Sequence, residues 1–443
     1  MIRKFLLGAE IRDIKFYKVA LVFLPLLFIY TIIVILFSTN ILQGDEGGYM
    51  RYATRIVTGL YFSSPTDVQL WWGIGYPLIL VPFVALNIPL IYIKILNALF
   101  LYGAILFLYN TLNNYIRPII ALVIAFLGGL YLPFLRELPF ILSESLTYFL
   151  VAGFIYYSCR LLKHDFLSLV DLLLAAFFMA YLALTKVFYG YMILVCVVLY
   201  GAFYIWSRSE KFRLLVLMYI IALIFCVPYL IGTYMITGNI YYWGTSGGMS
   251  LYWMSTPYAN EWGDWFSADD VKAIPELNIN HGMDFQKISS LSQPAMDAAL
   301  KKLAIENIIH NPKKFFINWL ANLGRLVFGY PHSYTQQDMT IFYYLVPNVP
   351  LITFFLFSLV PALFRWKQIP YEIKTSLFFA ILAFLGTSLL SAFVRLFTAL
   401  VPFLIVWMSF IYFKIINIHL TNLEIPNNTI ETVKEPIKRE IFW

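Results

Sequence analysis

Ten apolar segments, each about 20 residues long, dominate the sequence. A helix that crosses the hydrocarbon core of a bilayer needs about 20 mostly apolar residues, so each segment is long enough to span a membrane. The segments are 17–37, 90–110, 117–134, 141–159, 166–184, 187–206, 213–236, 341–364, 373–393 and 396–416. The composition agrees, because 61% of the 443 residues are apolar and only 12% are charged. The sequence therefore predicts an all-α polytopic membrane protein of about ten transmembrane helices and excludes a soluble enzyme or a disordered chain.

The positions of the cations predict how these helices are oriented. Ten spans place both termini on one side, and lysines and arginines flank the spans on that side, which the positive-inside rule identifies as the cytoplasm. These cations include Arg3, Lys4, Arg117, Arg160, Lys163, Arg208, Lys211, Arg365, Lys367 and Lys414. The net charge of +7 therefore reflects topology and not nucleic-acid binding. We expect a multi-pass protein of the cell (inner or plasma) membrane.

Four regions follow from this order of spans. They are an N-terminal transmembrane module (1–236), a large outer loop ending in an interfacial helix (237–340), C-terminal transmembrane helices (341–416) and a cytoplasmic tail (417–443). The first module contains an outer loop, 38–89, whose apolar half is broken by prolines and is expected to form juxtamembrane helices. Both long loops lie outside, so we expect the active site on the outer face.

Ionisable side chains close to a bilayer are costly and tend to mark function. Five places on the outer side stand out: Asp45-Glu46, the pair Arg51 and Arg55, Glu144, Lys186 and Arg395. A carboxylate can take a proton from an acceptor hydroxyl, and the cations suit a phosphate group. Each position also has an ordinary explanation, as a solvated loop, a headgroup contact or a snorkelling side chain. Glu137, in the loop before Glu144, is expected to be solvated.

The cysteines and acidic residues show no metal-binding pattern. Cys159, Cys196 and Cys226 fall inside apolar runs without the CxxC spacing of a zinc site, which predicts packing residues. A divalent metal at Asp45 and Glu144 is an alternative that no ligand spacing supports. The sequence therefore predicts no cofactor.

Several short motifs resemble those of the GT-C glycosyltransferases, in particular the branch of the aminoarabinose transferases and protein O-mannosyltransferases (families 39 and 83). In chain order they are Asp45-Glu46-x-x-Tyr49, Gly75-Tyr76-Pro77-Leu78, Ser143-Glu144-Ser145-Leu146, Leu184-Thr185-Lys186, Asn311-Pro312-x-x-Phe315 and Arg395 with Pro402-Phe403. These motifs extend from residue 45 to residue 403 and so cover nearly the whole chain.

The resemblance implies a GT-C helical bundle whose juxtamembrane helices roof a lipid cavity. It implies an inverting glycosyltransferase that moves a sugar from a polyprenyl-phosphate donor, such as undecaprenyl phosphate, to a hydroxyl on the outer face. The acceptor would be a cell-envelope glycan such as lipopolysaccharide, another lipid or a protein. Asp45 would be the general base with Glu46 beside it. The residues implied for the donor phosphate and its surroundings are Tyr49, Arg55, Glu144, Lys186 and Arg395. Arg51 is added to this set by its spacing alone, because it lies one helical turn before Arg55 on the same face and could clamp a phosphate with it.

A transporter or flippase for a lipid-linked glycan is the alternative class. Such transporters usually contain internal repeats and broken helices near the bilayer midplane, whereas this chain shows no repeat and its outer charges lie at the membrane rim. The pattern therefore favours an enzyme. Within the 237–340 loop, Trp262, Asp264 and His332 are candidate acceptor contacts, although tryptophan is equally typical of a membrane interface.

Overall fold

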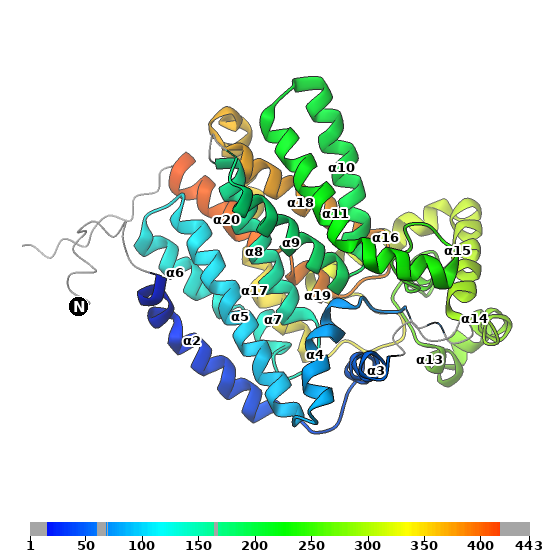
Figure 1. Cartoon of the computed structure of the whole chain (residues 1–443). Coiled ribbons are helices and arrows are strands. Elements are labelled where there is room, and N and C mark those ends of the chain that lie inside the picture. The colour runs from blue at the N-terminus through cyan, green and yellow to red at the C-terminus, as the bar shows by residue number, and fades with distance from the viewer. Residues whose placement is uncertain (1–15, 60–67, 69, 164–166, 417–443) are drawn as a thin grey trace, which may run out of the picture.

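The computed structural model describes residues 16–59, 68, 70–163 and 167–416 (Figure 1). Every element in these ranges is helical, so the predicted all-α class is confirmed. The predicted tail 417–443 and the cations that precede residue 16 lie outside the described residues.

The N-terminal half of the chain builds the main helical bundle, in which α8 lies between α5 and α9 (Figure 1). Burial follows this arrangement, because α8 is far more buried than α2 or α5. The helices of this half are α2 (Phe16–Phe37), α5 (Leu90–Asn113), α6 (Pro118–Gly129), α7 (Leu132–Arg136), α8 (Glu144–Lys163), α9 (Leu169–Thr185), α10 (Phe188–Ser207) and α11 (Glu210–Thr237).

Two further helices, α3 (Glu46–Val57) and α4 (Gly75–Ala85), lie between α2 and α5 along the chain. The proline-broken segment forms α4, whose 11 residues are too few to cross a membrane. The chain just before α4 approaches the end of α9 so closely that a Cβ on Gly73 would lie 2.0 Å from the carbonyl oxygen of Leu184. This contact fixes the α4 segment against the residue pair that precedes Lys186.

Residues 238–340 form a smaller helical unit at one end of the bundle (Figure 1). Its helices are α12 (Gly247–Met254), α13 (Ala268–Ala273), α14 (Pro275–Ile288), α15 (Gln293–His310), α16 (Pro312–Phe328) and the 3-10 turn η2 (Met339–Ile341). The unit has its own hydrophobic core, which includes Tyr252, Trp253, Leu277 and Leu300. The predicted interfacial helix at the end of the loop corresponds to α16.

The C-terminal helices complete the bundle. They are α17 (Phe342–Phe364), the 3-10 turn η3 (Trp366–Gln368), α18 (Tyr371–Ser388), α19 (Val394–Thr398), α20 (Val401–Phe410) and the π-helical turn η4 (Ile411–Ile415). α20 packs against α18, α5 and α8, while the short α19 contacts α16 and α7. This packing brings the α19 segment to the end of the bundle at which α8 begins.

Among the described residues, seven helices are long and apolar enough to cross a membrane, which makes the chain a multi-pass membrane protein. They are Lys18–Phe37, Leu90–Asn113, Glu144–Lys163, Phe188–Ser207, Glu210–Thr237, Met339–Phe364 and Val394–Ile415. The other three predicted spans fall on shorter or less apolar helices. The segment 117–134 divides into α6 and α7, 166–184 gives the 17 residues of α9, and 373–393 ends early, at Ser388.

Candidate functional site

Four charged side chains from distant parts of the sequence form one continuous ionic cluster. The Lys186 Nζ lies 2.8 Å from Glu144 Oε1. The Arg395 Nε lies 3.5 Å from the same oxygen, and the Arg395 guanidinium donates a hydrogen bond of 2.8 Å to Asp45 Oδ2. Two carboxylates and two cations therefore alternate in the order Asp45–Arg395–Glu144–Lys186. We call these four residues the site cluster.

All four members of the site cluster lie at helix ends, which places them at one end of the bundle. Asp45 precedes α3, Glu144 opens α8, Lys186 follows α9 and Arg395 lies in the short α19. Glu144 is buried, and its Oε2 atom has no hydrogen-bond partner among the described residues. A carboxylate in the first turn of a helix is favoured by the helix dipole, so the start of α8 also helps to hold this charge.

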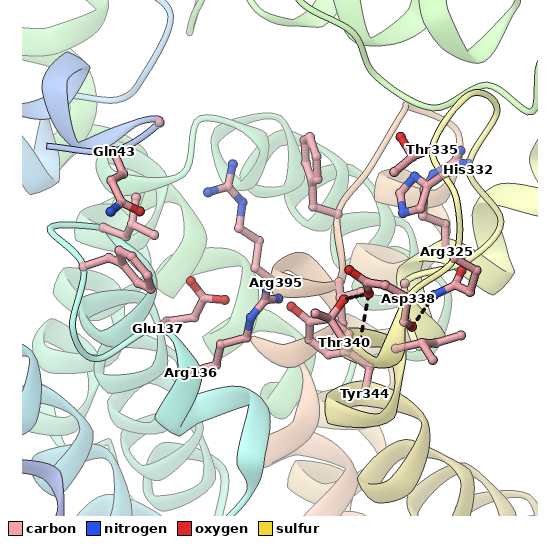
Figure 2. Close-up of a pocket in the computed structure, with 18 of the residues that line it drawn as sticks. Gln43, Arg136, Glu137, Arg325, His332, Thr335, Asp338, Thr340, Tyr344 and Arg395 are labelled. Carbon is pink, nitrogen blue, oxygen red and sulfur yellow. Dashed lines mark hydrogen bonds between the residues drawn. The ribbon is translucent and has the colours of Figure 1, made fainter. Parts of the chain in front are cut away.

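Two cavities flank the site cluster. The larger has a volume of about 580 Å³ and is lined by Asp45, Glu137 and His332, among other residues. The smaller, of about 190 Å³, is lined by Lys186. Arg395 lines both cavities. Figure 2 shows the larger cavity, with Gln43, Arg136 and Glu137 on one side, Arg395 near the centre, and His332, Thr335, Arg325 and Asp338 on the other side. The site cluster thus separates two spaces that meet at Arg395.

Glu137 is only partly solvated, which corrects the expectation of a solvated loop residue. It is half-buried and lines the larger cavity. Burial, and then the neighbouring charge of Glu144, raise the pKa of Glu137 to about 7, although Arg136, Arg395 and Lys186 act in the opposite direction. The larger cavity therefore contains, besides Asp45 and Asp338, a carboxyl group whose pKa lies near neutral pH.

Glu46 does not face either cavity. Its side chain is fully buried, and its two oxygens accept hydrogen bonds of 2.6 Å from the backbone N–H groups of Gln43 and Ile141. The buried Lys94 Nζ lies 3.5 Å from Glu46 Oε1 and donates to the carbonyl of Thr39. Glu46 therefore ties the loop that carries Asp45 to the segment before α8. These contacts give Glu46 a structural role, whereas the sequence predicts that it lies beside the base in the active site.

The other residues predicted around the donor divide into two groups. Tyr49 lines the smaller cavity, its ring packs on Trp72, and its hydroxyl lies 2.9 Å from Ser143 Oγ. Burial, and then the charge of Glu144, raise the pKa of Tyr49, so its hydroxyl stays protonated. Arg51 is exposed and Arg55 is half-buried, and neither lines either of the two cavities. The structure therefore brings Tyr49 to the site cluster but not the two arginines.

Only one of the three predicted acceptor contacts reaches the larger cavity. His332 lines it, and the His332 Nδ1 lies 3.7 Å from Asp264 Oδ2. Asp264 is buried behind His332 and accepts hydrogen bonds from the backbone and side chain of Ser333. Burial opposes ionisation of Asp264, but hydrogen bonds from His332 and Ser333 and the charge of Arg325 hold its pKa below the ordinary value. Trp262 instead packs its ring under the ammonium of Lys314.

The described residues contain no group of three or more His, Cys, Asp or Glu side chains that could hold a metal ion. The three cysteines are free thiols buried in the bundle.

The sequence matches no family profile and no curated protein sequence. Several solved structures are similar to this one, including the following two. The first is the archaeal oligosaccharyltransferase AglB from Archaeoglobus fulgidus in complex with an inhibitory peptide and a dolichol-phosphate, at 14% identity and a TM-score of 0.49, over 87% of this chain and 50% of that chain. The second is ArnT from Cupriavidus metallidurans bound to undecaprenyl phosphate, at 14% identity and a TM-score of 0.36, over 89% of this chain and 76% of that chain. The chain thus spans about half the length of the archaeal oligosaccharyltransferase.

Proposed function

We propose that this protein transfers a sugar from a polyprenyl-phosphate donor to a hydroxyl group of a glycan, lipid or protein acceptor. The observation that carries this proposal is the position of the site cluster between two cavities. A reaction between two substrates needs two adjoining spaces, and a leaving phosphate needs fixed cations. Asp45 lines one space, Lys186 lines the other, and Arg395 lines both.

In this mechanism Asp45 is the general base. The acceptor hydroxyl enters the larger cavity, its proton passes to the Asp45 carboxylate, and its oxygen forms a bond to the anomeric carbon of the sugar. The bond between that carbon and the phosphate oxygen breaks, and the polyprenyl phosphate leaves with the electron pair. Lys186 and Arg395 stabilise the negative charge that develops on the phosphate. Attack from the side opposite the phosphate inverts the configuration at the anomeric carbon.

We also propose that the reaction takes place on the outer face of the membrane. Glu144 opens α8, whereas Arg160 and Lys163 lie at the opposite end of the same helix. Lys186 likewise follows the end of α9, whose first residues lie close to Arg160. Cations at these far ends favour the cytoplasmic side for them by the positive-inside rule. The site cluster and the helical unit 238–340 would then lie outside, with both termini in the cytoplasm.

The test is transfer by the purified protein in nanodiscs, supplied with polyprenyl-phosphate sugars and with acceptor fractions from the cell envelope. Asp45→Asn keeps the size of the side chain but removes the base, so we expect kcat to fall by about 10²–10⁴-fold. Lys186→Met should raise KM for the donor, because it removes a phosphate contact. Asp269→Asn, on the exposed surface of α13, is the matched control and should transfer at the wild-type rate.

Two results would contradict the proposal. If Asp45→Asn transferred sugar as fast as the wild type, the assignment of the base would be wrong. If reconstituted protein moved a lipid-linked sugar across the bilayer and formed no transfer product with any acceptor fraction, the transporter alternative would replace the enzyme.

A further inference from the structure

We infer that the smaller cavity binds the sugar ring of the donor, and that this sugar is neutral. The inference rests on the proposed function and narrows its substrate class. Lys186 and Arg395, the proposed phosphate contacts, both line this cavity of about 190 Å³. A sugar attached to that phosphate therefore lies within reach of the cavity walls. Arg395 also lines the larger cavity, so the anomeric carbon can meet the acceptor where the two spaces adjoin.

Hydroxyl groups form much of the wall of the smaller cavity. Ser250 and Thr387 line it, and their hydroxyls donate to the backbone carbonyls of Ser246 and Ala383 at 3.0 and 2.9 Å. A hydroxyl that donates in this way keeps its oxygen lone pairs free to accept. The cavity therefore presents acceptors to the many O–H donors of an unmodified sugar.

Ser391 gives the most direct sign that a ligand forms a hydrogen bond with the wall of this cavity. It lines the smaller cavity, the residue is only 6% exposed, and its Oγ atom has no hydrogen-bond partner among the described residues. Buried polar atoms in proteins nearly always have a partner. A sugar hydroxyl in the cavity supplies one.

A cationic substituent on the sugar finds no counter-charge in this cavity. None of the described residues that line it is acidic. Glu144 is only 1% exposed and is covered by Lys186 and Arg395. Both of these cations already contact carboxylates and, in the proposed function, the phosphate. An ammonium on the sugar would be removed from water without a partner, which is strongly unfavourable. A carboxylate on the sugar would have to compete with the phosphate and the protein carboxylates for these two cations. A neutral, hydroxyl-rich sugar avoids that cost.

Aromatic side chains supply the remaining wall. Trp71, Trp72 and Phe393 line the smaller cavity. The Trp72 ring is held by Tyr49 and Tyr52, at ring-centre distances of 5.3 and 5.4 Å. A flat, fixed aromatic surface suits the apolar C–H face of a sugar ring, while the hydroxyls of the wall can bond the hydroxyls at its rim. The cavity thus matches both kinds of surface that a neutral sugar presents.

Binding measurements on the full-length protein in nanodiscs test this inference. The probes are undecaprenyl phosphate alone, undecaprenyl-phosphate glucose as the neutral donor, and undecaprenyl-phosphate aminoarabinose as the cationic donor. We expect the neutral donor to bind more tightly than the bare lipid phosphate, and the cationic donor to bind more weakly than the neutral one. Ser391→Ala should raise Kd for the neutral donor about five-fold, which is the size of one ordinary hydrogen bond, and should leave Kd for undecaprenyl phosphate unchanged.

Ser391→Ala removes an oxygen that bonds to nothing in the described part of the protein, so its thermal unfolding should match that of the wild type. Ser289→Ala, which removes an exposed hydroxyl on the helical unit 238–340, is the matched control and should change neither Kd. Equal binding of all three lipids, tighter binding of the aminosugar donor, or an unchanged neutral-donor Kd in Ser391→Ala would overturn the inference and leave the proposed function standing. Failure of undecaprenyl phosphate itself to bind would instead contradict the proposed phosphate contacts.

Discussion

Two ionic clusters in the described part of the molecule differ in which of their atoms are available to bind a ligand. The site cluster joins four segments of the chain between two cavities. The second lies within the helical unit 238–340 and consists of Glu261, His281, Tyr252 and Asp284. Its Tyr252 hydroxyl lies 2.7 Å from His281 Nδ1 and 2.9 Å from an oxygen of Asp284, and His281 Nε2 lies 2.9 Å from Glu261. We call these four residues the loop cluster.

The difference shows which buried charges indicate a site. In the loop cluster both oxygens of Glu261 are bonded, to Thr256, Asn280, His281 and Tyr334, and none of its four residues lines either cavity described above. In the site cluster, one oxygen of Glu144 has no hydrogen-bond partner among the residues that the structure describes, and Arg395 lines both cavities. A fully bonded buried network rigidifies its surroundings. A network with unused bonding capacity beside a cavity can bind a ligand.

The largest loss of stability is expected at the buried ion pair of Lys94 and Glu46, which supports the loop that carries Asp45. Lys94→Met leaves the Glu46 carboxylate buried without its cation. Removing one partner of a buried ion pair costs about 3–5 kcal/mol, so the free energy of unfolding in detergent should fall by that amount. Because Glu46 also holds the loop that carries Asp45, the transfer activity of the folded fraction should fall as well.

Lys302→Met is the matched control for this prediction, since Lys302 is exposed on α15. It removes the same charge and side-chain length without leaving a buried partner. Should Lys94→Met unfold at the same temperature as Lys302→Met, the pair at Glu46 would not be what holds the Asp45 loop.

Sequence reasoning could find Asp45, Glu144, Lys186 and Arg395 for a simple reason. Charges are scarce in this chain, and each of these four stands beside an apolar run. Their pairing was out of reach, because Asp45 and Arg395 lie 350 positions apart and only the packing of α19 near the start of α8 brings them together. Lys94 gave a weak signal, as one charge at the start of a span, which is equally typical of a snorkelling side chain.

The failures have physical causes too. Glu137 stands in a short loop, which predicts solvation, but the segment from Asp338 to Tyr344 and the residue Arg395 lie on other walls of the same cavity.

Hydropathy also overestimates the length of a membrane span where the helix breaks inside an apolar run. The segment 117–134 divides after Gly128-Gly129 and begins a new helix with Pro133 in its first turn. Glycine weakens a helix and proline favours its first turn.

The next effect concerns the loop cluster, and it is expected to appear in stability alone. His281→Gln removes a buried partner of Glu261, so we expect the free energy of unfolding to fall by about 1–3 kcal/mol. Kd for undecaprenyl phosphate and kcat of the folded protein should not change, because His281 touches neither cavity. A fall in kcat out of proportion to the loss of folded protein would break the distinction between the two clusters.

The loop cluster also has a pH signature. Burial opposes ionisation of Glu261, but hydrogen bonds and the charge of His281 outweigh it and lower the pKa below 4.5. A carboxyl group whose pKa is lowered by folding stabilises the native state above its unfolded pKa, and this stability is lost as the pH falls through the folded value. Unfolding monitored between pH 7 and pH 3 should therefore show an acid-side loss of stability that is smaller in Glu261→Gln, whose own stability at pH 7 is lower.

The smallest effect lies at Glu137, on the wall of the larger cavity, where the pKa is raised to about 7. Between the ordinary carboxyl range and pH 7 the native state binds a proton that the unfolded state has released, so stability falls as the pH rises through this interval and levels off above it. Glu137→Gln should flatten that slope and make the protein more stable than the wild type at pH 8.

If Glu137 contacts the acceptor, the pH profile of transfer in Glu137→Gln should also lose an ionisation near pH 7, while the maximal rate changes only a few-fold, since Asp45 remains. Glu276→Gln, exposed on α14, removes the same charge far from the cavity and should keep the wild-type pH profile. An unchanged profile in Glu137→Gln would show that the proton on this wall is not linked to the reaction, and the site cluster would then act through Asp45 alone.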